Sequence, residues 1–129
     1  MTRVRIAAGM MLAVCAAVLA VLYRFSPAQY SFYPRCPIYL TTHLLCPGCG
    51  GTRAMHELLH WNWRGAMHYN SLLTVLAPLA LLWFAYFCYQ ALRYDRLPVL
   101  EVPRFAIVTL GVVAVLFTVV RNTGIAFVI

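Results

Sequence analysis

Three long apolar runs constrain the fold of this chain more than any other feature of its sequence. They cover about residues 4–23, 71–92 and 104–121, and the second contains no charged residue. An α-helix rises about 1.5 Å per residue, so roughly 20 residues cross a hydrocarbon core about 30 Å thick. The third run reaches that length only if it begins at Pro103 or continues past Arg121. The pattern predicts an all-α integral membrane protein with three transmembrane helices.

The composition agrees with this fold class. Hydrophobic residues make up 64% of the 129 residues and charged residues only 10%, far from the usual soluble mixture. We expect one membrane domain over residues 1–129. Arg3 and Arg5 resemble the basic start of a signal peptide, but the following apolar run is long and no small-x-small cleavage site follows it. We therefore expect an uncleaved first helix.

The net charge of +7 comes from arginines at helix ends and in loops. This distribution favours contact with the lipid bilayer and the setting of topology over nucleic-acid binding. With three spans, the N-terminus and residues 93–104 share one side of the membrane, and arginines are dense on these short segments. The positive-inside rule then predicts a multi-pass cell-membrane protein with a cytoplasmic N-terminus and an exoplasmic connector between the first two spans.

That connector, residues 24–70, is rich in aromatic residues, proline and cysteine. Thr52 is a suitable N-cap for a short amphipathic helix that continues to about Arg64 and lies at the membrane surface. Asn70 or Ser71 can cap the second span, because a short polar side chain satisfies the first free amides of a helix.

The connector contains a compact cysteine motif, Cys46-Pro47-Gly48-Cys49-Gly50-Gly51-Thr52-Arg53. Two thiolates at C-x-x-C spacing can hold one tetrahedral metal ion. Cys36 and His56 lie near enough in sequence to complete a Cys₃His set, so zinc is a candidate cofactor. Such a closed site would be structural.

Other chemistries remain open for the same region. In an oxidising compartment Cys36 can pair with Cys46 or Cys49, or Cys46 and Cys49 can form a redox-active pair. His56-Glu57-Leu58-Leu59-His60 matches the HExxH pattern of zinc hydrolases, with Glu57 as general base and both histidines as ligands. The motif can also be purely architectural, with its prolines and glycines forming a tight turn that Arg53 stabilises.

Several short motifs together resemble a bacterial family of small membrane proteins. They are Cys36-Pro37, Thr41, the run from Cys46 to Ala54, Gly65-Ala66 and Asn70. The family is catalogued as a domain of unknown function with a CPxCGxTR-type motif, and the resemblance covers about residues 33–90. It implies a polytopic membrane protein and brings no activity, so function has to be argued from the site.

The sequence therefore favours a non-enzymatic accessory, scaffold or binding component of the bacterial envelope with a cysteine-stabilised connector. Because three spans bury little surface on their own, we expect a partner, either another membrane protein or a second copy of the chain. The alternative is a membrane enzyme, using either thiol–disulfide exchange at the cysteine motif or zinc hydrolysis at His56, Glu57 and His60.

Overall fold

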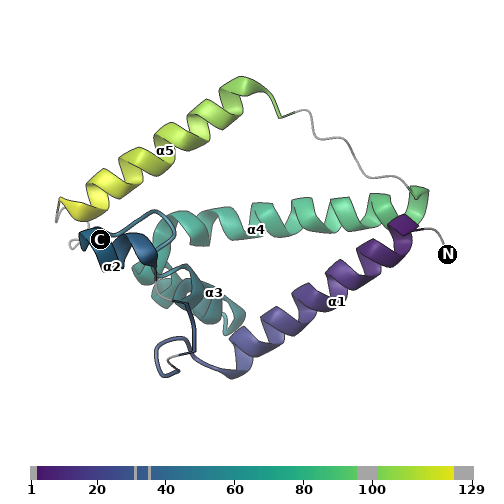
Figure 1. Cartoon of the computed structure of the whole chain (residues 1–129), viewed down its shortest axis with the longest axis horizontal. Helices are drawn as coiled ribbons and strands as arrows, with labels where there is room; N and C mark the ends of the chain where they lie inside the picture. The colour runs from purple at the N-terminus through teal and green to yellow at the C-terminus, as the bar shows by residue number, and fades with distance from the viewer. Residues whose placement is uncertain (1–2, 31, 35, 96–101, 124–129) are drawn as a thin grey trace.

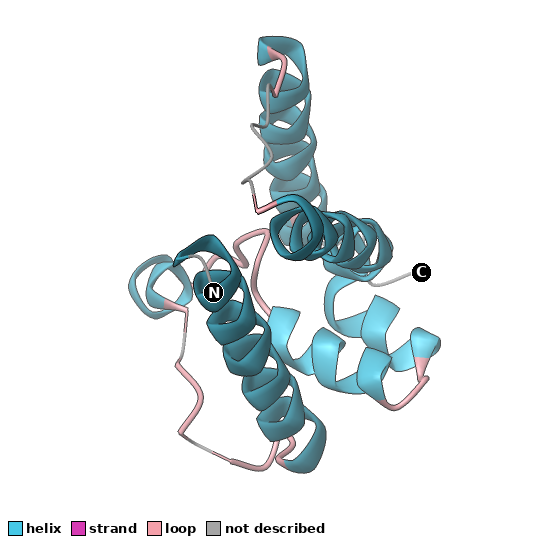
Figure 2. Cartoon of the chain, turned by 90° about the vertical axis from the view of Figure 1, so that its right-hand side faces the viewer, coloured by secondary structure: helices cyan, strands magenta, loops and turns pink. Residues whose placement is uncertain are grey.

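The computed structural model describes residues 3–30, 32–34, 36–95 and 102–123. Within these ranges the chain forms helices joined by loops (Figure 2). The helices are α1 (Arg3–Arg24), α2 (Pro37–Thr42), α3 (Gly51–Leu59), α4 (Trp63–Tyr94) and α5 (Arg104–Asn122), labelled in Figure 1. Three of them, α1, α4 and α5, are long and apolar enough to cross a membrane. The predicted all-α class is confirmed, with three helices of spanning length, and the described residues between the first two of them form the two short helices α2 and α3.

Helices α1 and α4 pack through small side chains. Figure 1 shows the start of α1 beside the end of α4, and the two helices are in contact. Ala8 of α1 and Cys88 and Ala91 of α4 are all buried. Small residues let two helices approach closely within a membrane, where lipid tails offer no hydrophobic drive for association. Cys88 therefore belongs to the helix packing, as its place inside a span suggests.

The short helix of the connector is shorter than the sequence predicts, and its cap is different. Gly50 is the N-cap of α3, so Thr52 lies inside the helix, and the helix ends at Leu59 instead of Arg64. Trp61 has a positive φ of 60°, which breaks the helix. Asn62 then starts a new one, because its side-chain oxygen accepts a hydrogen bond from the Gly65 amide at 3.1 Å.

The second long helix contains a break at Asn70, where φ is −161° and ψ is 96°. The Asn70 side chain accepts a hydrogen bond from the Leu73 amide at 2.9 Å and so caps the part of α4 that follows. The sequence prediction of a capped span beginning near residue 71 is correct for this part. The preceding helical segment, residues 63–69, extends α4 towards α3 and was not predicted.

Helix α5 begins at Arg104 after Pro103 and ends at Asn122, as the third apolar run predicts. Figure 1 shows α5 diverging from α4 along most of its length, with its C-terminal end near α2. The polar side chains at this end, Arg121 and Asn122, make hydrogen bonds to the cysteine-bearing part of the connector. The end of the last helix therefore positions the site described next.

Candidate metal centre

Three cysteines converge on one point in the connector. The Sγ atom of Cys46 lies 3.3 Å from that of Cys36 and 3.1 Å from that of Cys49. All three Sγ atoms lie within 4.8 Å of one another. These cysteines are free thiols, because the separations far exceed the roughly 2.05 Å of a disulfide bond. Cys49 is buried, whereas Cys36 and Cys46 are half-buried. We call this group the three-cysteine cluster.

Two segments bring these cysteines together. Cys36 is the N-cap residue of α2, which begins with Pro37. Cys46 and Cys49 lie in a turn closed by a hydrogen bond from the Cys49 amide to the Cys46 carbonyl at 3.1 Å. In addition, the Cys46 amide donates to the Cys49 sulfur at 3.2 Å. We call residues 45–50 the cysteine turn. An amide directed at sulfur stabilises the thiolate form that binds metal.

Gly50 lets the cysteine turn enter α3 and approach α4 closely. Its φ is 79°, in the left-handed region that favours glycine. A Cβ atom at this position would lie 2.6 Å from the Tyr69 carbonyl oxygen. Since real Cβ contacts are longer than this, a side chain at position 50 would push the turn away from α4. By contrast, a Cβ atom at Gly48 would meet only the Cys46 sulfur, at 3.9 Å.

Asn70 holds the cysteine turn from the side of α4. This side chain is 1% exposed, and its amide nitrogen donates to the carbonyls of Pro47 at 2.8 Å and Cys49 at 3.1 Å. Its oxygen caps the next part of α4 through Leu73. A single buried side chain thus fixes both the start of a membrane-length helix segment and the cysteine turn. This explains physically why an asparagine stands at the break in α4.

The other side of the turn is held by the end of α5. Arg121 donates to the carbonyls of Cys49 and Tyr69, both at 2.7 Å. Asn122 pairs with Leu45 in both directions, accepting from its amide and donating to its carbonyl, each at 2.9 Å. We call Asn70, Arg121 and Asn122 the clasp residues. Sequence reasoning missed the last two, although an Arg-Asn pair ending an apolar run was a usable signal.

The environment shifts the pKa values of Cys36 and Cys49 in opposite directions. The pKa of Cys36 is lowered from 9.0 to about 7, because the Tyr39 backbone and then the Cys46 and Cys49 thiols stabilise its thiolate. The pKa of Cys49 is raised to about 12, chiefly because burial disfavours a charged sulfur and then because its thiol partners compete for negative charge. A bound cation would relieve this competition by compensating all three sulfurs.

The cluster fits a thiophilic metal ion such as zinc. Tetrahedral zinc binds sulfur at about 2.3 Å, which places two sulfur ligands about 3.8 Å apart. The distances from the Cys46 sulfur to the sulfurs of Cys36 and Cys49 would need to increase by only about 0.5 and 0.7 Å, respectively. Cys36, Cys46 and Cys49 would hold the ion. Within the described part of the chain they are also the one group of at least three Cys, His, Asp or Glu side chains arranged for this purpose.

The residues of the HExxH pattern make other contacts. His56 donates through Nδ1 to the Leu22 carbonyl at 2.6 Å, at the end of α1. The ring of His60 stacks on that of Tyr23 with centroids 4.4 Å apart. Glu57 accepts a hydrogen bond from the Asn62 amide at 2.6 Å and so supports the cap of α4. These side chains join α3 to its neighbours, and the described residues supply neither His56 to the cysteine cluster nor a third ligand to the histidine pair.

The stabilisation of the turn by Arg53 stays a prediction, and the structure shows other side chains on the carbonyl that it was expected to support. The carbonyl of Cys49 is bound by Arg121 and Asn70. Arg53 is exposed on α3, with its guanidinium over the Tyr69 ring at 5.9 Å from the centroid. It is the third residue of α3, so it lies in the first turn of that helix.

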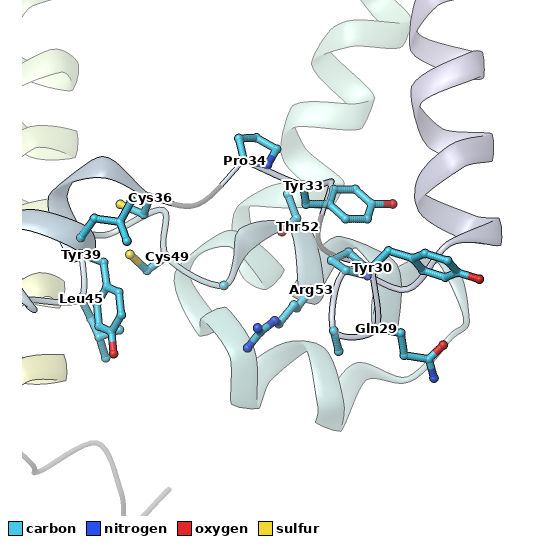
Figure 3. Close-up of a pocket in the computed structure, with 14 residues that line it drawn as sticks. Gln29, Tyr30, Tyr33, Pro34, Cys36, Tyr39, Leu45, Cys49, Thr52 and Arg53 are labelled. Carbon is cyan, nitrogen blue, oxygen red and sulfur yellow. The ribbon is translucent and has the colours of Figure 1, made fainter.

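Arg53 and Thr52 instead line a pocket of about 580 Å³ beside the cysteines. Figure 3 shows Cys36 and Cys49 on one side of this pocket and Thr52 and Arg53 on the other. Tyr30 and Tyr33, from the segment after α1, also line it. The pocket therefore joins the cluster to a polar wall that contains a cation.

Fold and site together define a small helical protein with three membrane-length helices and a clasped three-cysteine cluster. Residues 36–84 match the model of a family described as "Protein of unknown function (DUF2752)". The matched segment contains all three cysteines, α2, α3 and most of α4, and it excludes α1 and α5. No curated protein and no solved structure matched the chain. The resemblance in the cysteine region thus concerns a family without an assigned activity.

Proposed function

We propose that the chain is a non-enzymatic accessory or binding component of the bacterial cell membrane, whose connector is held by a zinc ion on Cys36, Cys46 and Cys49. The observation that carries the proposal is the convergence of three sulfurs from two separate segments within 4.8 Å. The metal joins α2 to the cysteine turn, and the clasp residues join that turn to α4 and α5. Metal binding then fixes the relative positions of helices far apart in the sequence.

The geometry favours a metal over a disulfide. A disulfide uses two sulfurs and leaves the third unpaired, whereas all three sulfurs here surround one point. The Cys46 amide aimed at the Cys49 sulfur supports a thiolate ligand. The carbonyls of Pro47 and Cys49 accept hydrogen bonds from Asn70 and Arg121, so two of the ligands are pre-positioned in the turn. The metal would add the link from this turn to Cys36 and α2.

We further propose that the connector is exoplasmic and the N-terminus cytoplasmic, as the arginine density favours. The bilayer would cover the apolar faces of α1, α4 and α5, and another membrane protein or a second copy of this chain would be the partner. A zinc-held connector would then present α2 and α3 as a rigid surface outside the membrane for that partner.

Thiol labelling in intact cells tests this proposal. A membrane-impermeant maleimide mass tag is applied to Cys15→Ser/Cys88→Ser protein, with and without a zinc chelator and with and without a reductant. We expect labelling of the cluster only after chelation. Labelling that requires the reductant would indicate a disulfide in place of the metal. Labelling without either treatment would indicate that the motif is only an architectural turn. Labelling only in opened cells would reverse the proposed topology.

A further inference from the structure

We infer that the fourth coordination position of the metal opens into the pocket beside the cluster and takes a small anionic thiol. This inference rests on the proposed function, because it needs a metal on the three cysteines. It adds a ligand-binding activity to a site that would otherwise be structural.

The first argument is the count of protein ligands. Structural zinc sites have four protein ligands, whereas sites that bind an exchangeable ligand have three and an open position. In the described ranges of the chain, three donors come together here and no His, Asp or Glu side chain joins them. His56, the fourth ligand expected from the sequence, is held by the Leu22 carbonyl.

The second argument is the location of the pocket. Two of the three ligands, Cys36 and Cys49, lie in its wall (Figure 3). Its volume of about 580 Å³ falls in the range of small-molecule sites. A ligand atom in the pocket would therefore approach the metal from the side of Cys36 and Cys49.

The third argument is charge. Arg53 is the one charged side chain among the described residues that line the pocket. On the far side of the turn, the Arg121 guanidinium is bonded to the Cys49 carbonyl. Zinc with three thiolates carries a net charge of −1, so cations close by would favour the binding of a fourth thiolate. Two arginines supply this compensation, and Arg53 can pair with a carboxylate on the incoming thiol.

These features define the ligand class as a small thiol that carries a carboxylate. The thiolate would complete the tetrahedron, and the carboxylate would lie against Arg53. Thr52 and the tyrosines of the wall, Tyr30 and Tyr33, would offer hydroxyl groups to the rest of the molecule. Binding would exchange a water or an open position for sulfur, with release of the thiol proton and no change in oxidation state.

Cobalt-loaded protein in detergent provides the test, since Co²⁺ replaces zinc in thiolate sites and its absorption reports each sulfur ligand. Full-length protein is titrated anaerobically with mercaptoacetate and, separately, with 2-mercaptoethanol. We expect a stronger sulfur-to-cobalt band with both thiols, and tighter binding of mercaptoacetate. In Arg53→Gln protein the mercaptoacetate affinity should fall about three- to fivefold, while 2-mercaptoethanol is unaffected. Arg64→Gln, at an exposed arginine outside the pocket, is the matched control.

The outcomes separate this inference from the proposed function. One cobalt per chain with a spectrum that neither thiol changes would overturn the open position and leave the metal site intact. Equal weakening of both thiols by Arg53→Gln, or no weakening of either, would overturn the anionic ligand class. Loss of cobalt to either thiol would overturn this inference alone, because the ion must first have been bound. Failure of the wild-type chain to bind cobalt at all would remove the proposed metal function and this inference with it.

Discussion

The guanidinium of Arg121 donates a hydrogen bond to the carbonyl of Cys49 at 2.7 Å, across 72 positions of sequence. The same side chain reaches the Tyr69 carbonyl at 2.7 Å. One arginine at the end of α5 thereby ties together the cysteine turn and the start of the membrane-length part of α4. An arginine at the end of an apolar helix usually anchors that helix at the membrane interface. Arg121 in addition links two other segments of the chain.

Replacing Arg121 with glutamine should destabilise the protein by about 1.5–3 kcal/mol, because two charge-assisted hydrogen bonds are lost and two carbonyls lose a donor. Denaturant unfolding in detergent micelles measures this change. Arg104→Gln, at the opposite end of α5, is the control and should change stability little. Equal effects of the two substitutions would contradict the clasp.

Asn70 should be harder to replace than its neighbour Ser71. Asn70→Ala removes a helix cap and two donors to buried turn carbonyls, which predicts a loss of about 2–4 kcal/mol. Asn70→Asp keeps the cap to Leu73 but places a carboxylate against the Pro47 and Cys49 carbonyls. It should therefore weaken metal binding at least as much as Asn70→Ala does. Ser71→Ala is the control, and retained metal content in Asn70→Asp protein would count against the role of the amide.

Gly50→Ala should damage the site where Gly48→Ala does not. The first substitution imposes a left-handed φ on alanine and sets its Cβ atom 2.6 Å from the Tyr69 oxygen. The cost exceeds about 1 kcal/mol from the backbone alone. Gly48 is exposed and has no such contact, so its alanine variant should stay within about 0.5 kcal/mol of wild type. Membrane abundance and unfolding of the two variants give the comparison, and matching values would show that the turn is not pressed against α4.

The cysteine pKa values predict a pH-dependent reactivity in metal-free protein. A thiol whose pKa is lowered to about 7 becomes a thiolate at lower pH, so alkylation of Cys36 should rise tenfold per pH unit below 7 and level off above about 8. Cys49, with its pKa raised to about 12, should react slowly across this range. Site-resolved mass spectrometry of iodoacetamide-treated protein lacking Cys15 and Cys88 measures both rates. A Cys36 rate that still climbs tenfold between pH 8 and 9 is the contrary result.

The helices were predictable because length and apolarity decide them. The runs at 4–23 and 104–121 correspond closely to α1 and α5. Asn70 was also predictable as a cap, since a short polar side chain before an apolar run has few other roles. The boundaries around α3 were not, because the start of the helix at Gly50 depends on its close approach to the Tyr69 carbonyl, which local patterns do not report.

The cysteines of the candidate site could be predicted from the sequence, whereas the clasp residues at the end of α5 could not. The C-x-x-C spacing identifies Cys46 and Cys49, and the third thiol, Cys36, follows from its short distance in sequence. The contribution of Arg121 depends on where the end of α5 lies, which no local pattern specifies. His56 and Glu57 matched a catalytic pattern because both suit the polar side of an amphipathic helix, and the structure gives them packing and capping contacts instead.

Metal analysis of purified protein, combined with X-ray absorption at the zinc edge, tests the central claim most directly. We predict about one zinc per chain bound by three sulfurs at about 2.3 Å. Cys36→Ser, Cys46→Ser and Cys49→Ser should each lose the metal, whereas Cys15→Ser and Cys88→Ser should retain it. Protein that is folded and reduced, yet holds no zinc and takes up none when it is supplied, would contradict the account.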